Sequence, residues 1–171
     1  MARIGVKFFI ISLSVLVMFT ACATKNAFSK FEMTEQEELS ISNLQSSKIM
    51  SGTVVKGVLS AVYLNEVYPN TFTKQEYFLV YLYQKEKQEM YNPNLLDDIK
   101  LTLKLNSQLP LKIKQLPHAN NYSHLIGMQN DWNRYYLVAF EESTSNSLSL
   151  SLESGQFSSV ALIYQKSLEN L

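Results

Sequence analysis

Short segments in which apolar residues alternate with polar ones, or run together, recur along the chain between residue 53 and residue 164. In segments 99–105 and 148–152, leucine or isoleucine occupies every second position, which places the apolar side chains on one face of a β-strand. Segments 77–83 and 135–140 are almost wholly apolar. Because both faces of such a strand must be covered, we expect these two segments to be central strands.

Three further segments have the character of strands: 53–64, 109–113 and 157–164. The polar residues 106–108 predict a hairpin between segments 99–105 and 109–113, with Pro110 at an edge or a strand start. The sequence shows no alternation of strands with helices and no internal repeat. About seven strands with turn signals between them predict an all-β fold, an antiparallel immunoglobulin-like or transthyretin-like sandwich.

The chain before these strands has a different character. Residues 23–30 are mostly small and polar and show no period, so they predict a flexible tether. Residues 34–37 read Thr-Glu-Gln-Glu, the pattern of a capping box at the start of a helix. We expect one short helix there; the alternative is a polar linker that contains the pattern by chance.

The first 21 residues have the three parts of a secretory signal: a basic start, an apolar stretch and small residues at its end. Arg3 and Lys7 provide the charge, and the apolar stretch runs from Phe8 to Phe19. A permanent membrane-spanning helix needs about 20 apolar residues, which is more than this stretch provides. Cys22 follows the small residues directly and is the sole cysteine of the chain.

Phe19-Thr20-Ala21-Cys22 resembles the lipobox that bacterial lipoprotein signal peptidase recognises. The resemblance implies cleavage before Cys22, a diacylglyceryl thioether on its sulfur and an acylated amino group, which together anchor a protein stably. Ala23 follows where Asp would favour the inner membrane, so the resemblance implies the outer membrane. The alternatives are an ordinary signal peptide cleaved elsewhere and an uncleaved N-terminal anchor.

We therefore divide the chain into a signal peptide (1–21), a lipidated N-terminus with the tether and the short helix (22–48), and a β-sandwich domain (49–171). Without the signal peptide, 13 basic residues remain against 15 acidic ones, a net charge of −2. This balance does not favour nucleic acid as a partner. The predicted partners are the membrane, through the lipid on Cys22, and another envelope component.

Few residues suggest catalysis or metal binding. His118 and His124 are the two histidines, and a zinc site needs three or four converging ligands. The acidic pairs Asp97-Asp98 and Glu141-Glu142 are adjacent, so their side chains point to opposite sides in a strand. We expect no enzyme, no cofactor and no metal site. The cluster we nominate for a competing ligand-binding or hydrolytic function is His124, Asp131 and Arg134.

Two further features of the sequence suggest surfaces. Four lysines would share one face of the predicted hairpin: Lys100, Lys104, Lys112 and Lys114. That face would either contact anionic headgroups or polysaccharide, or simply protect a strand edge from pairing. Trp132 and Tyr122 lie in the irregular stretch 120–133, where we expect them to attach the loop to the core rather than to form a binding surface.

Three short segments carry a looser resemblance to small β-sandwich lipoproteins of the bacterial envelope: Val62-Tyr63-Leu64-Asn65, Tyr77-Phe78-Leu79-Val80 and Tyr135-Tyr136-Leu137-Val138. In size, lipobox and all-β character the chain is also similar to the outer-membrane lipoprotein of type VI secretion systems. We expect a non-enzymatic envelope lipoprotein with a structural or protein-interaction role. The alternatives are a component of a secretion assembly and a periplasmic ligand-binding or hydrolytic protein.

Overall fold

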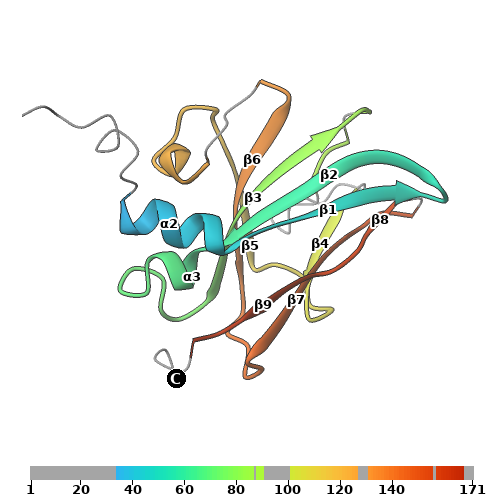
Figure 1. Ribbon diagram of the computed structural model, residues 1–171. Helices are drawn as coiled ribbons and strands as arrows, with labels where there is room; N and C mark the ends of the chain where they lie inside the picture. Colours follow the sequence, from blue (N-terminus) through green and yellow to red (C-terminus); the bar gives the residue numbers. More distant parts are fainter. Residues whose placement is uncertain (1–33, 87, 91–100, 127–130, 156, 168–171) are drawn as a thin grey trace, which may run out of the picture. The chain divides into compact units, whose positions relative to one another are not determined.

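The structure is a computed structural model that describes residues 34–86, 88–90, 101–126, 131–155 and 157–167. Within these residues nine strands form one sheet, in the order β4-β7-β8-β1-β2-β3-β6-β5, with β9 also paired to β7. The strands are β1 (Leu44–Ser51), β2 (Val54–Tyr63), β3 (Glu76–Gln84), β4 (Thr102–Leu105), β5 (Lys112–Leu116), β6 (Asn133–Phe140), β7 (Ser147–Glu153), β8 (Ser158–Ser159) and β9 (Leu162–Gln165). Every pairing between them is antiparallel. The predicted all-β, sandwich-like fold is confirmed, as a sheet that curls over its own inner face (Figure 1).

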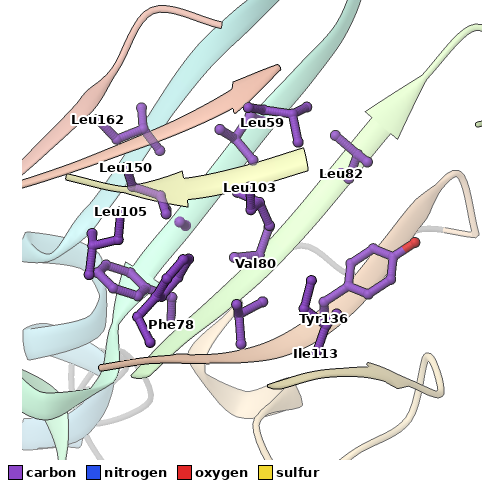
Figure 2. Close-up of a cluster of buried hydrophobic side chains, with 14 of the residues drawn as sticks. Leu59, Phe78, Val80, Leu82, Leu103, Leu105, Ile113, Tyr136, Leu150 and Leu162 are labelled. Carbon is purple, nitrogen blue, oxygen red and sulfur yellow. The ribbon is translucent and has the colours of Figure 1, made fainter. Parts of the chain in front are cut away.

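The inner face of the curled sheet encloses the main apolar core. Phe78, Val80 and Leu82 of β3 meet Leu103 and Leu105 of β4 across this core (Figure 2). Leucines of β7, at every second position as the sequence predicts, are also buried there. Complete burial of such a side chain contributes about 1.5–3 kcal/mol. The alternating pattern thus encodes this face of the sheet.

The outer face of the central strands is covered by short helices rather than by another sheet. These are α2 (Glu35–Ser42), α3 (Leu64–Val67) and the 3-10 helix η2 (Ser123–Leu125). A second buried cluster lies under them: Val62, Leu64, Val67, Phe72, Leu79, Leu125, Ile126 and Tyr135. Segments 77–83 and 135–140 are central strands as predicted, since β3 lies between β2 and β6, and β6 lies between β3 and β5.

The predicted helix at residue 34 is confirmed together with its capping box. The Thr34 N–H donates to Glu37 Oε2 at 2.7 Å, and the Glu37 N–H donates to Thr34 Oγ1 at 3.2 Å. The bond from the Thr34 backbone lowers the pKa of Glu37. Ser40 is the buried residue of α2, and its Oγ donates to the Leu125 carbonyl at 3.1 Å. A polar contact therefore helps to hold this helix on the outer face.

The predicted hairpin between segments 99–105 and 109–113 is wrong, although its turn exists. Leu105 and Gln108 exchange backbone hydrogen bonds of 3.0 and 2.8 Å around two residues of positive φ. The ladder stops there because Pro110 has no N–H to donate. Beyond the turn, β4 pairs with β7 and β5 pairs with β6, so the chain crosses from one edge strand to the other.

Two other strand predictions need correction. Strands do not start after Lys48, because β1 begins at Leu44. Its first five residues alternate between exposed and half-buried, and the half-buried ones, Gln45 and Ser47, are polar and gave no apolar signal. The last predicted strand, 157–164, is divided into β8 and β9, with an exposed Val160 between them.

Gly57 permits β2 and β3 to pair closely, because a Cβ at this position would collide with the Tyr83 carbonyl oxygen.

Candidate functional site

Two of the three residues nominated for chemistry, His124 and Arg134, have different hydrogen-bond partners. His124 Nε2 lies 2.6 Å from the Tyr68 hydroxyl. Arg134 donates from Nη2 to Oε1 of Gln84, and Asp131 is exposed. His124 and Arg134 thus contact different residues, Tyr68 and Gln84.

The two aromatic residues of the irregular stretch 120–133, Tyr122 and Trp132, differ in how far they are buried. Tyr122 packs against the outer cluster, as expected. The prediction for Trp132 is wrong, because 74% of this residue is exposed. His118 is also exposed, with its ring 5.6 Å from that of Tyr135. Trp132 directly precedes β6.

Of the four lysines, the structure describes three, and Lys104 does not share a face with Lys112 and Lys114. Lys104 on β4 pairs with Glu153 of β7 at 2.6 Å, whereas Lys112 and Lys114 lie on β5, the opposite end strand of the sheet. The prediction of a shared lysine face is wrong because it assumed that segments 99–105 and 109–113 form a hairpin. Lys100 and the pair Asp97-Asp98 lie outside the described residues, as does Cys22. Glu141 and Glu142 are exposed after β6.

A buried ionic centre that the sequence did not reveal lies where β3 begins. Glu76 is 2% exposed, and its Oε1 lies 2.5 Å from Lys166 Nζ, which follows β9. The same oxygen accepts the Ser143 N–H at 2.9 Å, and Oε2 accepts the Tyr63 hydroxyl at 2.6 Å. Lys166 also donates to the Ser143 carbonyl at 2.6 Å. Both carboxylate oxygens are thus engaged by donors from three different segments.

Burial sets the electrostatics around this centre. It raises the pKa of Tyr63, and the hydrogen bond to the Glu76 carboxylate raises it further. Tyr164, whose ring lies 6.0 Å from that of Tyr63, also has a raised pKa because it is buried. Its hydroxyl donates to the Ala61 carbonyl at 2.7 Å. Both phenols are held neutral and act as hydrogen-bond donors.

A partly open cavity of about 130 Å³ lies beside the ionic centre. Glu66, Glu142 and Thr73 are among the residues that line it, together with the centre itself. Glu66 is bonded to the backbone and hydroxyl of Ser167, which ties the end of the described chain to α3. The arrangement can hold the segment after β9 in place by charge and hydrogen bonding.

The sequence carries a weak signal of this centre. Glu76 is the charged residue directly before the apolar segment 77–83, and a charge at the start of a central strand needs a partner. The partner is 90 residues away, at Lys166, so spacing alone gave no means of pairing them. In the part of the chain that is described, no three His, Cys, Asp or Glu side chains are placed to hold a metal ion.

None of the helices in the described residues has the length and apolar character needed to cross a bilayer. Comparisons of the chain with protein-family models, with curated proteins and with solved structures found no match.

Proposed function

We propose that this chain is a non-enzymatic lipoprotein of the bacterial cell envelope, anchored through a lipid on Cys22. The observation that carries the proposal is the position of the sole cysteine, directly after an apolar stretch and two small residues. A free thiol is a liability in an exported protein, whereas a lipidated one has a function. Ala23, in the place where Asp would favour the inner membrane, supports the outer membrane as the location.

The start of the described fold agrees with such an anchor. The eleven residues 23–33 separate Cys22 from Thr34, where the capping box begins. Fully extended, they reach at most about 40 Å, so the sheet would stay close to the membrane surface. The role we propose is to present this sheet to another envelope component at that distance.

The buried ionic centre favours a structural role over an acid–base one. A general acid or base needs a carboxyl group that can exchange a proton with a substrate. Glu76 instead accepts from Lys166, Ser143 and Tyr63 and is almost completely buried. We infer that this centre stabilises the fold.

The test replaces the anchor residue in full-length chains expressed in a bacterial host. Cys22→Ala should leave the uncleaved precursor without lipid, detected by intact mass, and should abolish its outer-membrane location, detected by fractionation. Ala23→Asp keeps the lipid and serves as the matched control; it should stay in membranes but move to the inner membrane. Normal cleavage and normal outer-membrane location of Cys22→Ala would contradict the proposal.

A further inference from the structure

A groove on the outer face of the sheet combines an apolar floor with a cationic rim. It has a volume of about 410 Å³, within the range of small-molecule sites. The residues that line it are Gln75, Tyr77, Lys112, Lys114, Leu137 and Ala139. None of them belongs to the ionic centre or to the proposed anchor.

The strand register explains why the groove exists. Ala139 on β6 lies between Tyr77 on β3 and Lys112 on β5, in one row across three strands. Neighbouring strands are about 4.8 Å apart, so the two larger side chains start about 10 Å from each other across a small alanine. Leu137 continues the floor in the next row, beside Lys114. The groove is therefore one strand wide and follows β6.

One wall of the groove is fixed. The Tyr77 hydroxyl donates to Gln75 Oε1 at 2.8 Å, and the Tyr77 ring lies 4.7 Å from that of Phe72. These contacts hold the tyrosine in place beside the floor. The wall is thus formed before any ligand binds, which reduces the entropic cost of binding.

The opposite wall carries two lysines whose charges are not neutralised by the described residues. Ion pairs among those residues involve Lys56, Lys104 and Lys166. Lys112 and Lys114 are exposed and stand two positions apart on β5, so both lie on the groove side, about 6.6 Å from each other along the strand. Two such ammonium groups favour an anionic head group.

We propose that this groove binds a single-chain amphiphile with an anionic head group, its chain on Leu137 and Ala139 and its head group at Lys112 and Lys114. A floor one strand wide accommodates one chain rather than the two of a bilayer lipid. A peptide fits less well, because the apolar floor offers its backbone no hydrogen-bond partners. The inference goes beyond the proposed anchoring and does not depend on lipid at Cys22.

The test is photolabelling of the full-length protein in isolated membranes with a long-chain fatty acid that carries a diazirine. Mass spectrometry should locate the label in β3 and β6, beside Tyr77, Leu137 and Ala139, and decanoate in excess should abolish it. Lys112→Gln/Lys114→Gln should reduce the labelling about fivefold to tenfold, since it removes both ammonium groups at which the head group would bind. The melting temperature should not change.

Lys48→Gln/Lys85→Gln is the matched control, because it removes two other exposed lysines, and it should label like the wild type. An equal loss of labelling in the two double variants would overturn the proposal, and so would a label outside β3 and β6. The lysines of β5 would then only protect a sheet edge from pairing. Competition by an acidic peptide but not by decanoate would overturn it in favour of a protein partner. Groove labelling by a photoreactive diacyl phosphatidylglycerol that decanoate does not compete with would indicate a bilayer contact instead.

The same labelling of the Cys22→Ala variant separates this inference from the anchor. Labelled β3 and β6 in this unlipidated protein would support the groove. Loss of groove labelling in this variant, with its melting temperature unchanged, would overturn the groove as an independent site.

Discussion

The two faces of strand β3 differ in what covers them, although both are apolar. Phe78 on the inner face has its ring centroid 5.1 Å from that of Tyr63 on the neighbouring strand β2 and 5.3 Å from that of Tyr164 on the distant strand β9. Tyr77 on the outer face meets Phe72 from the loop after α3 and borders a groove that is open to solvent. From this difference we expect the inner face to supply most of the stability, while the outer face keeps accessible surface beside Tyr77.

The largest effect should come from removing the aromatic ring at the centre of the inner face. Phe78→Ala should lower the free energy of unfolding by about 3–5 kcal/mol, because it leaves a cavity among side chains that cannot collapse. Tyr77→Ala, its neighbour on the other face, should cost about 1–2 kcal/mol, since Tyr77 is only partly buried. Urea unfolding followed by circular dichroism measures both, and equal losses would abolish the distinction between the faces.

Glu76→Gln should have the next largest effect. It should lower the free energy of unfolding by about 3 kcal/mol, because it leaves the Lys166 ammonium buried without a counter-charge. Adding Lys166→Met should recover part of this loss, since an apolar side chain needs no partner. The same unfolding experiment on the single and double variants gives the coupling between the two residues. If the loss in free energy of unfolding of the double variant equals the sum of the losses of the two single variants, the ionic pair is not the source of the effect.

A smaller effect should appear at alkaline pH. Burial raises the pKa of Tyr81, on the outer face of β3, to about 12. The folded chain then keeps a proton that the unfolded chain loses near pH 10. This contribution is present below about pH 10 and is lost as pH rises through 12, at most about 2 kcal/mol given the partial exposure of the ring. Unfolding experiments at successive pH values, with Tyr81→Phe as the control, measure this contribution. The same alkaline loss of stability in Tyr81→Phe would show that the loss comes from groups other than Tyr81.

Much of the inner face could be predicted from the sequence, because a strand period of two is a local signal. The central positions of β3 and β6 and the capping box at Thr34 followed from short patterns of this kind. The partners of β4 and β5 could not be predicted, because one missing N–H at Pro110 decides whether a turn continues into a hairpin.

The candidate sites were harder to predict because they are made by long-range pairing. Glu76 and Lys166 are far apart in sequence, and the groove depends on the register that places Ala139 between Tyr77 and Lys112. The exposure of Trp132 shows the same limit, since composition does not tell on which side of a loop an aromatic residue lies. The sequence shows the lysines of β5, but it does not show which residues of β6 lie beside them.

Native-state hydrogen exchange on the full chain tests the contrast between the two faces most directly. Helix α2, attached to the outer face through Leu39 and Ser40, should exchange by local opening at free energies well below that of global unfolding. The amides of β2, β3 and β6 should exchange only with global unfolding. Equal protection of α2 and of these strands would contradict the account, because the outer cover would then be as firmly held as the inner core.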